Sequence, residues 1–179
     1  MRIISGKYKN RKINFTKLKV RPTTNFAKES LFNLLNNRIN LENIKVLDLF
    51  SGSGNIILEF ISRGSTLNVA IDSNPKCVHF IKKIQEELKI NNLEVYCSTA
   101  TKYIYQCNYK FDVIFIDPPY NFKQFEYENI IETINKKKII NNGGSVVIEH
   151  SKFINFNNYN NFVEQRNYGK VNFSFLYYD

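Results

Sequence analysis

The chain has 179 residues, with 25 Lys and Arg against 16 Asp and Glu and a formal net charge of +9. This length suits one domain that buries roughly 70% of the surface of its unfolded chain. No stretch approaches the roughly 18 consecutive apolar residues of a membrane span, and the N-terminus has no secretory h-region. Cys77, Cys97 and Cys107 lack C-x-x-C spacing. We therefore expect a cytoplasmic protein without disulfides or a metal.

The excess positive charge lies at the N-terminus. The first 28 residues contain nine Lys and Arg and no acidic residue, whereas the remainder of the chain contains 16 of each sign. A basic segment this dense is typical of a surface that contacts nucleic-acid phosphates, and a solvated tail is the alternative. The residues that we expect to contact RNA are Arg2, Lys7, Lys9, Arg11, Lys12 and Arg21.

The first elements fall within this basic segment. Residues 2–15 alternate loosely between apolar and polar, which predicts a small β-hairpin or two paired extended segments. Thr23 or Thr24 can cap a helix that runs to about Asn36. Its apolar residues recur at helical spacing: Ala27, Leu31, Leu34 and Leu35.

Strands and helices then alternate regularly. Strands are predicted at 44–50, 66–72, 93–97, 111–117 and 144–150, and helices at 54–63, 75–90, 101–106 and 124–138. Such alternation predicts a parallel sheet with helices on both faces. A short helix near 158–163 should precede an antiparallel pair formed by Gln165–Tyr168 and Val171–Tyr178. We expect residues 1–40 to form a basic extension packed on a catalytic domain of residues 41–179.

A glycine turn follows the first of these strands. Asp48 lies near the strand end, and the chain then reads Ser51-Gly52-Ser53-Gly54. Glycines allow a tight turn into a helix and a close approach to a ligand. Asp72 ends the next strand, where a carboxylate would reach ribose hydroxyls, as in NAD enzymes. An NAD enzyme is thus a rival interpretation, but Ile57 replaces the third glycine of its fingerprint. Asp48 before the turn suits a cofactor with an amino-acid tail and no pyrophosphate.

The tetrapeptide Asp117-Pro118-Pro119-Tyr120 ends the strand predicted at 111–117 and is the most specific motif. The prolines hold Asp117 and Pro118 extended, so the carbonyl of Pro118 points stably out of the strand end. A carboxylate and a carbonyl at one place can both accept hydrogen bonds from a planar –NH2 group. Tyr120 offers a face on which a base can stack, typically for about 1–3 kcal/mol. A simple surface turn is the alternative. Together with the glycine turn, the motif predicts a nucleotide-like cofactor and a base amine as acceptor.

With these motifs, the chain resembles the RsmD family of bacterial small-subunit ribosomal RNA guanine-N2 methyltransferases from end to end. The matching strings are Arg2–Tyr8, Arg21–Thr24, Lys28–Phe32, Val46–Gly54, Ser62–Gly64, Asp117–Tyr120 and Tyr168-Gly169. The resemblance implies an α/β, Rossmann-like class I methyltransferase fold. Its seven-stranded, mostly parallel sheet has an antiparallel last strand, and a basic N-terminal β-hairpin and helix are added. It further implies S-adenosylmethionine as cofactor and a guanine in 16S ribosomal RNA, expected to be guanine 966, as target. We expect a monomer that acts on an assembling or assembled small subunit.

The resemblance also implies roles for individual residues. The catalytic set is Asp117, Pro118, Pro119 and Tyr120. The cofactor-binding set is Asp48, Phe50, Gly52, Ser53, Gly54, Asp72, Ser73, Thr99, Ala100 and Thr23. Within it, the glycine turn would line the methionine end of the cofactor and Asp72 its ribose. Because Thr99 stands where such enzymes often have an Asp or Asn, backbone groups are expected to hold the adenine. The segment Arg21–Thr24 packs over the cofactor cleft in the resembling family.

Two other functions share parts of this pattern. An adenine-N6 methyltransferase acting on DNA or RNA uses the same tetrapeptide. Its DNA versions usually insert a target-recognition domain, whereas only 62 residues separate Gly54 from Asp117. A non-catalytic ribosome-assembly factor could use the basic segment alone, but it would have no need for the glycine turn, Asp72 and the tetrapeptide together. His150, at the end of the strand at 144–150, carries no clear role.

Overall fold

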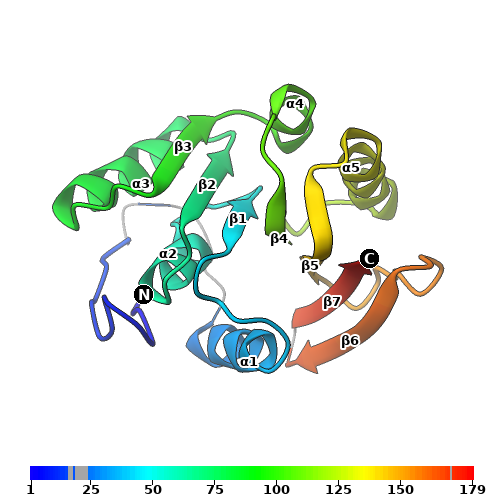
Figure 1. Ribbon diagram of the computed structural model, residues 1–179, viewed down its shortest axis with the longest axis horizontal. Coiled ribbons are helices and arrows are strands. Elements are labelled where there is room, and N and C mark those ends of the chain that lie inside the picture. Colours follow the sequence, from blue (N-terminus) through cyan, green and yellow to red (C-terminus); the bar gives the residue numbers. More distant parts are fainter. Residues whose placement is uncertain (16–17, 19–23, 170) are drawn as a thin grey trace.

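A seven-stranded sheet with the order β3-β2-β1-β4-β5-β7-β6 forms the centre of the computed structural model (Figure 1). The structure describes residues 1–15, 18, 24–169 and 171–179. The strands are β1 Lys45–Asp48, β2 Leu67–Asp72, β3 Leu93–Cys97, β4 Phe111–Ile116, β5 Ile140–His150, β6 Phe162–Tyr168 and β7 Val171–Tyr178. β7 runs antiparallel to both neighbours, and the pairs among β1 to β5 are parallel. The predicted mostly parallel sheet with an antiparallel last strand is therefore confirmed.

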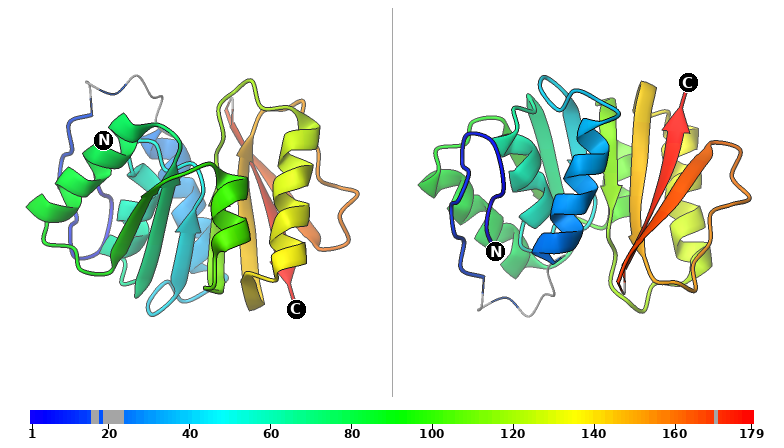
Figure 2. Two further views of the ribbon diagram at one scale, coloured as in Figure 1. Left: turned by 90° about the horizontal axis from the view of Figure 1, so that it is seen from above. Right: turned by 90° about the horizontal axis from the view of Figure 1, so that it is seen from below.

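Helices cover both faces of this sheet, α4 and α5 on one side and α1 and α2 on the other (Figures 1 and 2). They are α1 Asn25–Asn36, α2 Asn55–Ser62, α3 Pro75–Glu87, α4 Ala100–Gln106 and α5 Gln124–Lys137. β4 shows how the two layers arise, because Val113 and Phe115 pack into one apolar layer and Ile114 and Ile116 into the other. A strand buried on both faces reads as a continuous apolar run, which is why the sequence predicted it.

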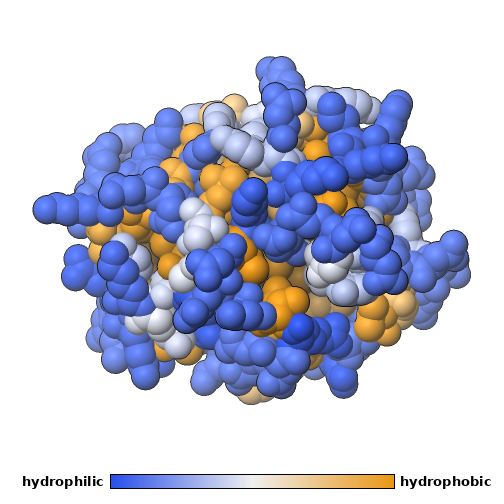
Figure 3. Space-filling model, in the orientation of Figure 1, coloured by the Kyte–Doolittle hydropathy of each residue, from blue (hydrophilic) through white to orange (hydrophobic). Residues whose placement is uncertain are grey.

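Hydrophilic residues cover most of the molecular face seen in Figure 3, with smaller hydrophobic patches between them. Among the described residues, no helix has both the length and the apolar character needed to cross a bilayer.

The C-terminal region departs from the prediction in two places. The short helix expected near 158–163 is wrong, because turns occupy 157–161 and β6 begins at Phe162. The side chain of Asn155 accepts a hydrogen bond from the backbone N–H of Asn157 at 2.7 Å, a local turn that competes with helix formation. β5 begins at Ile140 rather than 144, with a register shift against β4 and a left-handed Gly143 at φ +77°.

The N-terminal segment forms the predicted paired extended chains, although the pairing is short. Met1 and Ile13 exchange two hydrogen bonds of 3.0 Å, and Arg2 forms an antiparallel bridge with Lys12. α1 follows with Thr24 as its N-cap, whose hydroxyl accepts from the N–H of Ala27 at 3.2 Å. Arg21 and Thr23, predicted to contact RNA and cofactor, lie outside the described residues.

Gly6 fastens this segment to the end of α2. Its φ is +80°, and an added Cβ would lie 1.7 Å from the carbonyl oxygen of Ser62. This close approach allows the N–H of Lys7 to donate to that carbonyl at 2.7 Å, and the N–H of Tyr8 to donate to the Ser62 hydroxyl at 2.9 Å. The loop therefore satisfies acceptors at the end of α2, and only glycine fits at its centre.

A buried ion pair makes a second connection to α2. The Lys28 Nζ of α1 lies 3.2 Å from the Glu59 carboxylate of α2, and neither residue is exposed. The ammonium also donates to the backbone carbonyl of Arg2 at 2.8 Å and to the side chain of Asn55 at 2.9 Å. Burial lowers the pKa of Lys28, while the charge of Glu59 opposes this shift. Lys28 is thus one of the nine basic residues of the N-terminal segment, yet it cannot contact RNA.

Glu59 joins three parts of the chain through this pair. Besides Lys28, its two oxygens accept from the backbone N–H groups of Ile4 and Ser5, at 2.9 and 3.1 Å. Arg63, one turn further along, adds an ion pair of 3.0 Å. Because these donors satisfy a fully buried carboxylate, the N-terminal segment has one preferred position on α1 and α2.

Candidate active site

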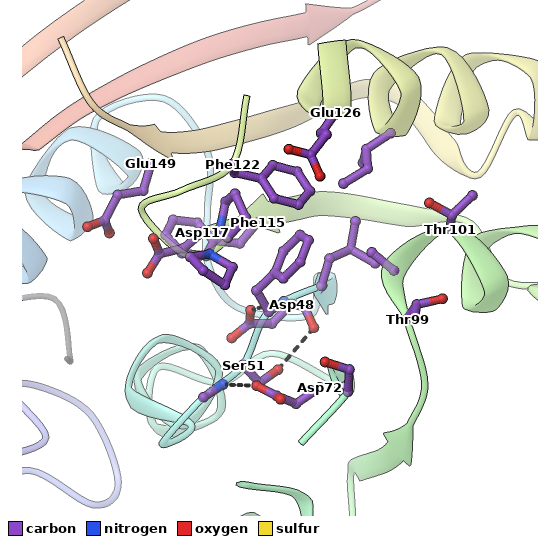
Figure 4. Close-up of a pocket in the computed structure, with 18 of the residues that line it drawn as sticks. Asp48, Ser51, Asp72, Thr99, Thr101, Phe115, Asp117, Phe122, Glu126 and Glu149 are labelled. Atoms are coloured by element: carbon purple, nitrogen blue, oxygen red, sulfur yellow. Dashed lines mark hydrogen bonds between the residues drawn. The ribbon is translucent and has the colours of Figure 1, made fainter. Parts of the chain in front are cut away.

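A cavity of about 760 Å³ opens at the carboxyl ends of β1, β2, β4 and β5 (Figure 4). From β1 the chain continues to β2 and β3 on one side, whereas β4 leads to β5 on the other. β1 and β4 are therefore the neighbours at which the strand order reverses, the usual position of a ligand crevice in open α/β sheets. Asp48 ends β1 and Asp117 follows β4, so the two central acidic residues of the sequence analysis meet at this point.

The glycine turn forms one wall. Gly52 and Gly54 have φ values of +51° and +75°, which favour glycine. A Cβ at Gly52 would meet no atom within 4 Å, so this part of the cavity wall is open backbone. Ser53 lines the cavity as well. Gly54 instead caps α2 and packs against Ile81, away from the lining residues.

Asp72 holds this turn in place. One carboxylate oxygen accepts from the N–H of Gly52 at 2.8 Å and the other from the N–H of Asn74 at 2.7 Å. A carboxylate has about four acceptor positions, so these two bonds leave capacity for hydroxyl groups of a ligand. Asp72 and Ser73 both line the cavity beside the glycine turn.

Two acidic residues of the cavity, Asp48 and Asp117, have raised pKa values. Burial raises the pKa of Asp48 to about 7. A hydrogen bond from the N–H of Phe50 lowers this pKa by a smaller amount, and the charge of Asp72 raises it. Burial also raises the pKa of Asp117, and the charges of Glu149 and Asp48 raise it further. Carboxylates placed together in this way favour a ligand that carries positive charge.

The Asp117–Tyr120 motif leads from the cavity to the surface. Pro118 is buried, while the carbonyl of Pro119 accepts from the N–H of Phe122 in a turn. Tyr120 is 63% exposed and lines the cavity mouth. Phe125, at the start of α5, is equally exposed and lines the same mouth. Two exposed aromatic side chains therefore lie at the mouth of the cavity.

The opposite end of the cavity is formed by the loop between β3 and α4. Ser98, Thr99, Ala100 and Thr101 all line it. The Thr99 hydroxyl caps α4 by accepting from the N–H of Lys102 at 3.4 Å. Figure 4 shows Thr99 and Thr101 on one side of the cavity and the carboxylates of Asp117 and Glu149 on the other. The cavity thus has an acidic end and an end lined by small residues.

Nine of the ten predicted cofactor-binding residues are described, and eight of these line the cavity, as do all four residues of the predicted catalytic motif. Sequence reasoning missed Glu149, Phe125, Glu126 and Asn129. Glu149 follows the apolar run of β5 as Asp117 follows that of β4, so the same argument would have found it. The other three lie on α5, and the sequence contains no motif that marks which of its residues face the cavity.

His150 is buried behind Glu149. Its Nδ1 lies 2.8 Å from the carbonyl oxygen of Ser151, and its Nε2 lies 2.8 Å from the hydroxyl of Ser174. Burial lowers the pKa of this histidine. His150 lines the small cavity that adjoins the main one, beside Asp117 and Glu149, and its contact with Ser174 joins β5 to β7.

The predicted RNA-contacting residues that the structure describes, Arg2, Lys7, Lys9, Arg11 and Lys12, are all exposed. Arg11 and Lys12 also line a groove of about 730 Å³ against α3. That helix contributes Lys76, His79 and Lys83 to the groove, with Phe80 between them. Lys76 and Lys83 add positive charge beside the N-terminal segment, and the acidic Glu87 lines the same groove.

Comparisons with known proteins agree with this geometry. A family model described as Conserved hypothetical protein 95 matches residues 1–177. The chain is 35% identical over 156 residues to the Ribosomal RNA small subunit methyltransferase D of Buchnera aphidicola subsp. Baizongia pistaciae, covering 87% of this chain and 78% of the relative. It is 32% identical over 136 residues to the Escherichia coli protein of that name, and the match covers 75% of this chain and 65% of the relative. A solved structure, the putative methyltransferase yhhF from Escherichia coli, superposes with a TM-score of 0.86 and 25% identity, covering 98% and 96%.

Proposed function

The chain belongs to the family described as Conserved hypothetical protein 95, the RsmD family, and we propose that it methylates a guanine N2 amine in 16S ribosomal RNA. S-adenosylmethionine is the methyl donor, and the expected target is guanine 966 of the small subunit. The substrate implies action in the cytoplasm, where ribosomal subunits assemble. The observation that carries the proposal is one cavity that brings the glycine turn together with the Asp117–Tyr120 motif.

The residues of the cavity fit S-adenosylmethionine. Its ammonium and sulfonium groups are both cationic, and the cavity holds Asp48 and Asp117, whose pKa values are raised by burial and by neighbouring acidic residues. A positive charge placed beside these carboxylates would favour their ionised forms. The amino-acid end would lie against the open backbone of Gly52, and the ribose hydroxyls against Asp72. The adenine would lie between Thr99 and apolar lining residues such as Ile130.

When bound, S-adenosylmethionine supplies a methyl group on a positively charged sulfur. The chain contributes the orientation of the acceptor. Asp117 and the carbonyl of Pro118 accept hydrogen bonds from the base amine, which turns the nitrogen lone pair away from the ring and toward the cofactor end of the cavity. In the transfer, this lone pair would form the new N–C bond as the bond between the methyl group and sulfur breaks. The sulfur would keep that electron pair and leave as a neutral thioether, and the methylated amine would then release one proton to water. Orientation of this kind is worth several kcal/mol of the barrier.

The mouth of the cavity suits an unstacked base. Tyr120 and Phe125 present exposed aromatic faces, and base stacking on such faces contributes about 1–3 kcal/mol per base. The exposed N-terminal Lys and Arg residues would hold the RNA backbone, because phosphate contacts set affinity and orientation rather than base choice.

The test is methylation of small ribosomal subunits from a strain that lacks this enzyme, followed by mass spectrometry of the digested RNA. We expect one N2-methylguanine per 16S RNA. Appearance of N6-methyladenine instead would support the adenine-N6 alternative. Calorimetry with S-adenosylmethionine separates catalysis from a binding-only assembly factor, since a folded sample that fails to bind it at near-millimolar concentration would refute the enzymatic proposal.

A further inference from the structure

Glu149 is a buried carboxylate in the cavity wall to which the mechanism above gives no role. It is 8% exposed and lines both the main cavity and a small adjoining one that Asp117 and Tyr127 share. Its backbone is fixed, because the Tyr127 hydroxyl donates to the Glu149 carbonyl at 3.4 Å and the next residue, His150, is held on both ring nitrogens. The side chain therefore extends from a rigid strand end.

The sheet places Glu149 beside Asp117. β4 and β5 are parallel, with Ile116 opposite Ile148, so the next residue on each strand lies at the same level. Adjacent strands are about 4.8 Å apart. The carboxylates are close enough that the charge of Glu149 helps to raise the pKa of Asp117. Figure 4 shows both on the same side of the cavity, away from Thr99 and Thr101. Two carboxylates thus line the acceptor end.

The nucleobases differ in what they offer to such a pair. Guanine has an N2 amine and, next to it, a ring N1–H, so its edge presents neighbouring donors to two acceptors. Adenine has its N6 amine next to a ring nitrogen that is an acceptor, and cytosine has the same arrangement. A carboxylate accepts hydrogen bonds when ionised, so a second carboxylate beside the amine site matches guanine and repels the ring nitrogen of the other two.

We propose that Glu149 accepts a hydrogen bond from guanine N1–H while Asp117 and Pro118 hold the N2 amine, which makes Glu149 the residue that selects guanine over adenine. This inference rests on the proposed guanine-N2 transfer and extends it to base selection. A site built to hydrogen-bond a substrate group discriminates strongly against an analogue that lacks the group, because its own polar atoms are then left unpaired.

The decisive acceptor is 2-aminopurine, which keeps the N2 amine but has an unprotonated ring N1. Small subunits are reconstituted with 16S RNA carrying guanine or 2-aminopurine at the methylated position, and kcat/KM is measured for each. We expect the wild type to prefer guanine by about 100-fold or more. In Glu149→Gln, kcat/KM for the guanine acceptor should fall about 10- to 100-fold, because a charged hydrogen-bond acceptor is replaced by an amide. The amide N–H can donate to 2-aminopurine N1, so that acceptor should hold its rate or gain.

Matched variants separate selection from structural damage. Glu126 also lines the cavity, with its carboxylate accepting from the N–H of Lys123 at 2.8 Å. Glu126→Gln should leave the preference between the acceptors unchanged, and Asp117→Asn should slow both by a similar factor, since both carry the N2 amine. Thermal melts and S-adenosylmethionine affinity of each variant report on folding and cofactor binding.

An equal fall of kcat/KM on both acceptors in Glu149→Gln would overturn the inference about Glu149. It would not affect the proposal that the enzyme methylates guanine N2. If the variant does not fold, the wild type alone decides, because equal rates on guanine and 2-aminopurine would exclude recognition of N1–H. A wild type that methylates no guanine at all would refute the proposed function, and the base-selection inference with it.

Discussion

Acidic side chains with little solvent exposure occur at two places in this molecule, and their surroundings differ in how far they compensate the negative charge. Beneath the N-terminal segment, Glu59 receives Lys28, Arg63 and two backbone N–H groups. In the cavity, burial and neighbouring acidic residues raise the pKa values of Asp48 and Asp117. The first arrangement satisfies its charge within the chain and so stabilises one fold. The second makes ionisation of the cavity carboxylates unfavourable, and a cationic ligand and a base amine would offset that cost. Perturbed pKa values of this kind are more typical of a functional site than of a structural ion pair.

The largest effect should follow from removal of the acceptor carboxylate in the cavity. Asp117→Ala should lower the methylation rate by orders of magnitude, because the amine loses the group that orients its lone pair. Cofactor affinity should change by less than about tenfold, and calorimetry alongside the rate assay checks this separation. An unchanged methylation rate in Asp117→Ala would refute the proposed mechanism.

Breaking the structural pair should instead affect stability. Lys28→Ala leaves the Glu59 carboxylate buried without its ammonium partner, so the free energy of unfolding should fall by about 3–5 kcal/mol, measured by urea denaturation. The matched control is Lys83→Ala, which breaks the Lys83–Glu87 pair of 3.8 Å on the surface of α3. Exposed pairs contribute about 0–1 kcal/mol. Comparable losses in the two variants would show that burial does not distinguish these pairs.

The cavity carboxylates should also give the stability of the ligand-free protein a characteristic pH dependence. The folded-state pKa of Asp48, about 7, lies above its ordinary value of 3.8, so the native state retains this proton more tightly than the unfolded chain. The free energy of unfolding should therefore fall as pH rises from about 4 to 7, by at most about 4 kcal/mol. Asp48→Asn should flatten this slope, raise the melting temperature at pH 8 and weaken S-adenosylmethionine binding. A variant that melts lower at pH 8 and binds the cofactor normally would contradict the assignment.

The difference between the two places also shows what the sequence could predict. Asp48, Asp72 and Asp117 could be singled out because the glycine turn, the end of the second strand and the Asp117–Tyr120 motif mark them in the sequence. The structure places all three in one cavity. Lys28 was counted with the basic residues of the N-terminal segment but was not among the expected RNA contacts. Its burial could not be predicted, because its partner Glu59 lies 31 residues away and only the packing of α1 on α2 joins them. Phe125 was missed because the face of α5 that meets the cavity depends on tertiary packing.

The smallest effects should come from the exposed basic residues, which are solvated and act additively. Replacing Arg2, Lys7, Lys9, Arg11 and Lys12 by Gln should weaken RNA binding and lower the slope of log affinity against log salt by roughly 3–5 units, if each contacts one phosphate. Replacing only Lys76 and Lys83, on the α3 side of the groove that Arg11 and Lys12 line, should lower it by about 1–2 units. Neither set should change the cofactor affinity or the unfolding free energy by more than about 1 kcal/mol, since the side chains are exposed.

Lys28 provides the control for these substitutions. Lys28→Met should leave the slope of log affinity against log salt unchanged in whatever fraction remains folded, because this residue is buried although it belongs to the same basic segment. A salt slope that fell with Lys28→Met and not with the five exposed residues would reverse the assignment of the two roles.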